Sequence, residues 1–82
     1  MNDIKDHTYY DIIIIKIEDL ISLIIENNNL NFDDALDYLY NSILYENLIN
    51  EETKLWHLST KKLFEIIELE KKTNEFIYPD FV

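Results

Sequence analysis

Glu18-Asp19-Leu20-Ile21-Ser22-Leu23-Ile24-Ile25-Glu26 is the stretch that decides the fold of this chain. At about 100° per residue, its acids and Ser22 fall on one side, and Leu20 and Ile24 fall on the other. The preceding Tyr9–Ile17 is rich in β-branched isoleucine, so alone it could pass for a buried strand. The helical phase nevertheless continues through both stretches. We therefore predict a helix over Thr8–Asn27.

The apolar arc of this predicted helix is wider than one small core needs. Ile13 and Ile17 join the core side, and further isoleucines flank it, so that the arc covers more than half of the circumference; the flanking residues are Ile14, Ile21 and Ile25. Such a helix is either central to the core or covered by a second chain. Because a small protein has little else to cover it, we expect Ile14 and Ile21 to contact a partner or a second copy in a homo-oligomer.

Three further helices follow from capping residues and spacing. Asn31 and Ser59 are N-cap candidates, and Ser42 marks a restart where the helical phase breaks past Ile43. They predict helices over Phe32–Asn41, Ile43–Ile49 and Thr60–Thr73. Between the last two, Leu55–Leu58 either packs inward or forms a short extended segment. The pre-proline stretch 76–79 is extended, and it either lies over the core or pairs with Leu55–Leu58.

The predicted fold class is therefore all-α, a small bundle of about four helices in a single domain, residues 1–82. A chain of 82 residues buries only about 60% of the surface of its unfolded form, so its core is thin. We expect eight side chains to be buried and three to be mostly buried. The first set is Leu20, Ile24, Leu36, Leu39, Trp56, Leu63, Phe64 and Ile67; the second is Ile13, Ile17 and Phe32.

The charge is strongly unbalanced. Seventeen Asp and Glu face seven Lys, with no Arg, and the formal net charge is −10. This charge opposes nucleic acid and anionic membrane surfaces, whose binding needs clustered cations. It favours a basic partner protein, although simple solubility explains it equally well. The acidic Met1–Asp6 does not fit a signal peptide, and the uncharged Leu20–Ile25 is far shorter than the ~20 residues of a membrane span. We expect a cytoplasmic protein.

The residue inventory argues against catalysis. Cys and Gly are both absent, which excludes thiolate chemistry, phosphate-binding loops and a nucleophile elbow. His7 and His57 are the only histidines, and they lack the spacing of a metal site. We expect no enzyme activity, no cofactor and no metal. Glu70 is unusual because it falls within the apolar arc of the last predicted helix.

Aromatic side chains point instead to binding. Tyr, Phe and Trp make up 13% of the chain, and Tyr and Trp dominate the energetics of protein interfaces. Tyr38 falls off the apolar face of its predicted helix, and Tyr45 lies where the helical phase breaks. With the acidic Asp33, Asp34 and Asp37, these tyrosines complete our set of expected partner-binding residues.

The second half of the chain resembles a known family. The stretches that carry the resemblance are Phe32–Ser42 and Asn50–Trp56, with the loose patterns Ala-Leu-x-x-Leu-Tyr-x-Ser and Glu-Thr-x-Leu-Trp. They are similar to short uncharacterised bacterial proteins, often encoded in clusters with toxin-like genes. Members often have Gly after the Thr of the second pattern, where Lys54 stands here. The resemblance implies an antitoxin-like or accessory role and carries over no catalytic residue.

Two functional hypotheses follow. The first is a non-catalytic protein-binding module, antitoxin-like or accessory, whose partner is basic or toxin-like. The alternative is an acidic nucleic-acid mimic that inhibits a DNA-binding enzyme, which net charge alone supports.

Overall fold

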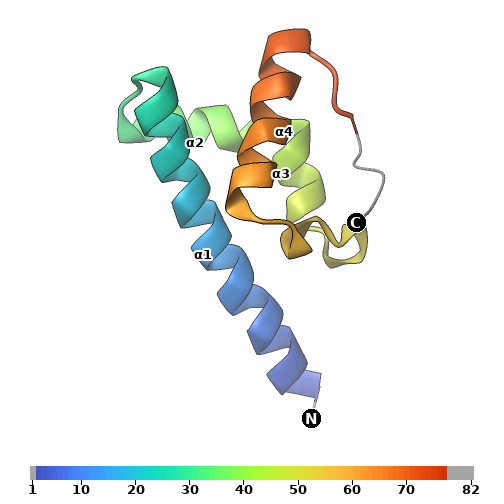
Figure 1. Cartoon of the computed structure of the whole chain (residues 1–82). Helices are drawn as coiled ribbons and strands as arrows, with labels where there is room; N and C mark the ends of the chain where they lie inside the picture. The colour runs from blue at the N-terminus through green and yellow to red at the C-terminus, as the bar shows by residue number, and fades with distance from the viewer. Residues whose placement is uncertain (1, 78–82) are drawn as a thin grey trace.

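The computed structural model describes residues 2–77, with side chains from Tyr9 onward. Within them the chain forms four α-helices and two short 3-10 helices (Figure 1). The elements in chain order are α1 Asn2–Asn28, α2 Phe32–Tyr40, α3 Ile43–Leu48, η1 Glu51–Thr53, η2 Leu55–His57 and α4 Thr60–Thr73. The predicted all-α fold is confirmed, and no strand occurs among residues 2–77.

The helix starts follow from local capping chemistry. Asn31 Oδ1 accepts the backbone N–H of Asp34 at 2.8 Å, and Ser42 Oγ accepts that of Tyr45 at 3.0 Å. Ser59 caps α4 in the same way. Each cap satisfies an N–H group that has no partner within its own helix. The predicted N-caps Asn31 and Ser59 are confirmed, and so is the restart at Ser42, which caps α3. α4 has the bounds that the sequence predicted.

This chain has no glycine, and residues with a left-handed backbone conformation follow α1, η1 and α4. Asn29 follows α1 with φ 56°, and Asn74 follows α4 with φ 60°. Asparagine tolerates this conformation better than other residues that carry a Cβ. Lys54, between η1 and η2, has φ 65°. The turn therefore places a lysine where the backbone geometry favours glycine.

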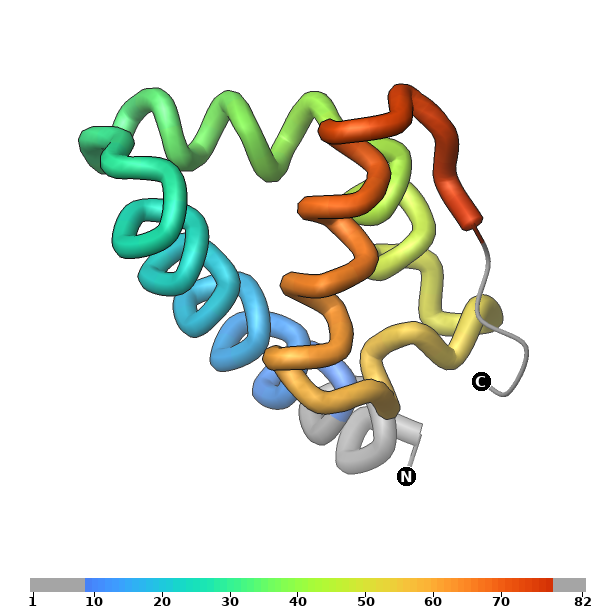
Figure 2. Tube along the Cα trace, turned by 45° about the horizontal axis from the view of Figure 1, so that its top comes forward, coloured from blue at the N-terminus to red at the C-terminus, as the bar shows by residue number. Residues whose placement is uncertain are grey.

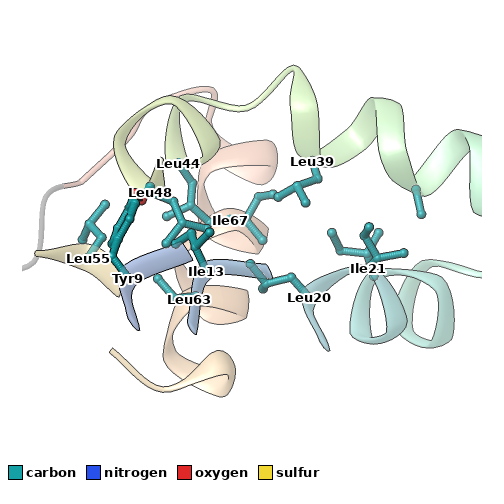
Figure 3. Close-up of a cluster of buried hydrophobic side chains, with 12 residues drawn as sticks. Tyr9, Ile13, Leu20, Ile21, Leu39, Leu44, Leu48, Leu55, Leu63 and Ile67 are labelled. Carbon is teal, nitrogen blue, oxygen red and sulfur yellow. Dashed lines mark hydrogen bonds between the residues drawn. The ribbon is translucent and has the colours of Figure 1, made fainter. Parts of the chain in front are cut away.

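The core is one cluster of buried side chains to which all four α-helices contribute. Tyr9 and Ile13 of α1 meet Leu48 of α3 at one end (Figure 3), and Leu39 of α2 lies toward the other. Its most deeply buried side chains are Leu20, Ile24, Leu39, Leu44, Leu48, Leu55, Leu63 and Ile67. Figure 2 shows α1, α2 and α3 following one another around α4. Of these three helices, α1 and α3 make the main contacts with α4.

Most predicted burial is confirmed. Leu36, Trp56, Phe64 and Ile17 are half-buried at the margin of the cluster. The prediction for Phe32 is wrong, because its side chain is 58% exposed. Phe32 opens α2 at the corner where the chain leaves α1 (Figure 1). It therefore precedes the turns of α2 that pack through Ala35 and Leu39.

The structure decides between the two alternatives for Leu55–Leu58. Leu55–His57 is a 3-10 helix with Leu55 fully buried, so this segment packs inward instead of extending. Residues 74–77 are not helical, and Phe76 packs against the core. The rest of the predicted extended stretch 76–79 lies outside the described residues. None of the helices in the described part of the chain combines the length and apolarity needed to cross a membrane.

Candidate partner-binding surface

Several large apolar side chains on α1, α2 and α3 are open to solvent. Tyr10 is 60% exposed, Ile14 54%, Tyr40 48% and Ile49 48%. Tyr45 is half-buried, and its ring centroid lies 4.8 Å from that of Tyr40. We call these five residues the tyrosine–isoleucine face.

Helical spacing places Tyr10 and Ile14 of this face on one side of α1. At about 100° per residue they lie on the same flank of the buried stripe that includes Ile13, and Lys16 lies on the opposite flank. The Lys16 ammonium donates a hydrogen bond to the backbone oxygen of Leu58, just before α4. The flank that carries Tyr10 and Ile14 therefore points away from the start of α4.

The same reasoning places Tyr40 on α2. The Tyr38 hydroxyl donates to Glu68 Oε2 of α4 at 2.7 Å, so the Tyr38 flank of α2 faces α4. Tyr40 lies on the other flank of the buried stripe formed by Ala35 and Leu39. Tyr40 thus faces away from α4, as Tyr10 and Ile14 do.

The remaining two residues connect α3 to this face. Tyr45 and Ile49 are one helical turn apart and therefore adjacent, and the ring of Tyr45 contacts that of Tyr40. The Tyr9 hydroxyl donates to the backbone oxygen of Leu48 at 3.3 Å, while its ring packs against Tyr10 at 5.3 Å. These contacts bring Tyr10 of α1 to the end of α3.

Exposed carboxylates surround the apolar residues. Asp11 and Glu18 lie three and four residues from Ile14, Asp37 lies three before Tyr40, and Glu46 lies three before Ile49, so each is a neighbour on its helix surface. Residues 17–53 contain nine Asp and Glu and no Lys or Arg. Lys16, the nearest cation along α1, is held on the opposite flank. The face therefore has an apolar centre and an acidic rim.

The structure divides the seven predicted partner-binding residues. Ile14 is exposed on the face, and Tyr45 lies within it. Asp33, Asp34 and Asp37 are all exposed along α2. Ile21, in contrast, is only 8% exposed and belongs to the core. The structure therefore places Ile21 in the core of its own chain, and not at the contact between chains that the sequence led us to expect.

Tyr38 also makes its contacts within its own chain, with side chains of α4. Besides its hydrogen bond to Glu68, its ring lies 4.7 Å from the Lys71 ammonium. Burial first, and then the hydrogen bond to Glu68, raise the pKa of the Tyr38 phenol well above its usual value of 10.0. The phenol therefore stays protonated and donates to Glu68 at neutral pH.

Tyr10, Tyr40 and Ile49 were not among the predicted contact residues. Tyr40 is the last residue of α2 and Ile49 directly follows α3, and both helices are short. The break in helical phase past Ile43 indicates that Ile49 points away from the face of α2, but it does not show whether another helix covers Ile49. Burial raises the pKa of Tyr45, with a further increase from Tyr40, so its phenol stays neutral under physiological conditions.

The described residues offer no candidate metal site. Among them, no three His, Cys, Asp or Glu side chains are grouped in a way that could hold a metal ion. His57 stacks on Trp56, with 4.0 Å between ring centroids, as expected from their adjacency. Comparison with protein-family models, curated proteins and solved structures found no match for this chain.

Proposed function

We propose that this protein is a non-catalytic module that binds a partner protein through the tyrosine–isoleucine face. The observation that carries the proposal is the exposure of Tyr10 and Ile14 on α1, Tyr40 at the end of α2 and Ile49 directly after α3. Tyrosine supplies a large contact area at low entropic cost, and a buried apolar centre with a polar rim is the usual anatomy of an interface.

The acidic rim indicates a partner with positive charge. Like charges placed opposite one another in an interface cost several kcal/mol, whereas complementary charges speed the encounter. A basic or toxin-like partner in the cytoplasm meets this condition. The acidic rim, together with the family resemblance over about the last fifty residues, supports an antitoxin-like or accessory role.

Capture with matched variants tests this function. The bait is the full chain as wild type, as Ile49→Ser on the face, and as Leu69→Ser on α4, where Leu69 is 43% exposed. Circular dichroism first establishes that all three fold alike. We expect the wild type and Leu69→Ser to capture the same protein from an extract of the source cells, and Ile49→Ser to lose it.

Two results would count against the proposal. If Ile49→Ser and Leu69→Ser capture the same set of proteins, the face is not the binding surface. If the captured protein binds DNA and duplex DNA displaces it from the bait, the nucleic-acid mimic is the correct function. In that case charge reversal on α2, and not Ile49→Ser, should abolish capture.

A further inference from the structure

The backbone of this protein limits how a partner can be recognised. Residues 2–77 contain no strand, so the described part of the chain has no sheet edge onto which an extended peptide could add. Its exposed side chains are therefore the candidates for contact with a partner. Tyr10 with Ile14, and Tyr45 with Ile49, are pairs spaced one helical turn apart, so each forms an apolar ridge along its helix axis.

These ridges suit the docking of another helix. An amphipathic helix presents apolar residues at i, i+3, i+4 and i+7 along a single stripe. Such a stripe can pack between the ridge of α1 and the ridge of α3, with Tyr40 at the α2 side. The Tyr9 hydroxyl, which donates to the Leu48 backbone oxygen, links α1 next to Tyr10 with the end of α3.

Charge distinguishes between the helices that could dock. Asp11 and Glu18 border the α1 ridge, and Asp37 and Glu46 border the α2 and α3 side, so carboxylates flank the apolar centre on both sides. The same face of a second copy would bring a second acidic rim against the first. A helix whose apolar stripe is flanked by Lys or Arg would instead pair with both sides.

We propose that the occupant of the tyrosine–isoleucine face is a basic amphipathic helix of the partner protein. This inference rests on the proposed function and specifies its binding mode. The apolar stripe of the helix covers Ile14, Tyr45 and Ile49, while its flanking cations meet Glu18, Asp37 and Glu46.

Synthetic peptides added to the full-length protein test the binding mode. The first peptide contains leucine and lysine at amphipathic helical spacing. The second has the same composition in scrambled order, and the third replaces lysine with glutamate. Titration calorimetry and amide chemical shifts measure binding and its location. We expect the first peptide alone to bind, to gain helix on binding, and to shift the amides of residues 10–18 and 40–49.

Two pairs of variants make the test specific. Ile49→Ser should weaken binding of the first peptide about tenfold or more, while Leu69→Ser should not change it. Glu18→Lys should weaken binding several-fold, while Asp19→Lys should change it much less. Glu18 and Asp19 are both exposed neighbours, but helical spacing directs Glu18 toward the flank of Ile14 and Asp19 toward the flank of Lys16.

The outcomes separate this inference from the proposed function. Equal binding of the scrambled peptide, a proline-rich basic peptide that binds more tightly, or amide shifts confined to α4 would each overturn the helical occupant. Self-association through the face at neutral pH in sedimentation would overturn it too. If the first peptide fails while Ile49→Ser still loses the cellular partner, the inference falls and the proposed function stands.

Discussion

The carboxylate of Glu70 is buried and accepts hydrogen bonds from the first turn of a different helix. Its oxygens lie 2.6 Å from the backbone nitrogen of Ile43 and 3.0 Å from that of Leu44. Ser42 Oγ accepts the backbone N–H of Tyr45. The first three N–H groups of α3 therefore all have hydrogen-bond acceptors. A six-residue helix has little stability of its own. Glu70 therefore attaches α3 to α4 and explains a carboxylate on an apolar face.

Removing this charge should be costly. Glu70→Gln keeps the shape but turns part of the acceptor into a donor that faces two backbone N–H groups. We expect the free energy of unfolding to fall by about 2 kcal/mol, as measured by urea denaturation, with faster hydrogen exchange at Leu44. The exposed Glu65→Gln on the same helix is the control. A change no larger than the control's would mean that α3 does not depend on this contact.

Tyr38 links stability to alkaline pH. The raised pKa of its phenol lies above the unfolded value of about 10. The associated stabilisation is therefore complete below pH ~10 and is lost as the pH rises through the folded-state pKa. Tyr38→Phe should lower the free energy of unfolding by about 1 kcal/mol at neutral pH and make its decline above pH ~10 shallower. The exposed Tyr40→Phe should leave stability at neutral pH unchanged; an equal loss there would refute the role of the hydroxyl bond to Glu68.

Among the elements, the turn from η1 to η2 carries the clearest backbone strain. Lys54 has φ 65° and ψ 8°, and this conformation costs a residue with a Cβ about 1 kcal/mol or more. Lys54→Gly should raise the free energy of unfolding by about 0.5 kcal/mol, because the greater freedom of glycine in the unfolded chain offsets part of the gain. Thermal unfolding measures this. Lys54→Ala removes the charge but keeps the strain, so a gain from alanine as large as that from glycine would contradict the explanation.

In α1, two isoleucines two turns apart have different roles. Ile21 is 8% exposed and Ile14 is 54% exposed. Ile21→Asp places a charge in the core and should lower the free energy of unfolding by about 3 kcal/mol or more. Ile14→Asp should change it by no more than about 0.5 kcal/mol while abolishing partner binding. Urea denaturation followed by circular dichroism measures both. A similar loss of stability in the two variants would show that Ile14 is also structural.

The positions of the helices were more predictable from the sequence than the exposure of their outer flanks. Capping at Asn31, Ser42 and Ser59 is a local effect, so the starts of α2, α3 and α4 were predictable. Which flank of an apolar helix is covered depends on where the other helices lie. This is why the exposure of Phe32 and the burial of Ile21 were not recognised from periodicity. Periodicity marked Glu70 as unusual within an apolar arc, but its contact with α3 spans more than twenty residues, so the sequence could not identify its partner.

Over the whole molecule, charge is distributed unevenly. Residues 17–53 carry nine acids and no Lys or Arg, whereas residues 54–77 carry five of the seven lysines. In the described residues the structure shows one ion pair, between Lys62 and Glu65 of α4. Within the part of the chain whose side chains are described, the acids of α1, α2 and α3 therefore form no ion pair. A partner that approaches the tyrosine–isoleucine face meets a field of one sign.

This separation of charge and apolar contact leads to a kinetic prediction for the complex with the partner protein. Exposed charges mainly set the association rate and its salt dependence, while buried contacts set dissociation. Charge reversal at Asp33, Asp34 and Asp37 should therefore slow association and flatten its salt dependence. Tyr40→Ala or Tyr45→Ala should speed dissociation roughly thirtyfold, which corresponds to the loss of about 2 kcal/mol of binding free energy at a hot spot.

Binding kinetics at two salt concentrations test both sets of variants, after circular dichroism has established that each variant is folded. Tyr38→Ala is unsuitable here, because it would also break the contact with Glu68. A nucleic-acid mimic would show the reverse weighting, since its carboxylates would carry most of the affinity and binding would weaken steeply with salt. Aspartate variants that abolish binding, together with tyrosine variants that do not affect it, would therefore replace the protein-binding module with the mimic.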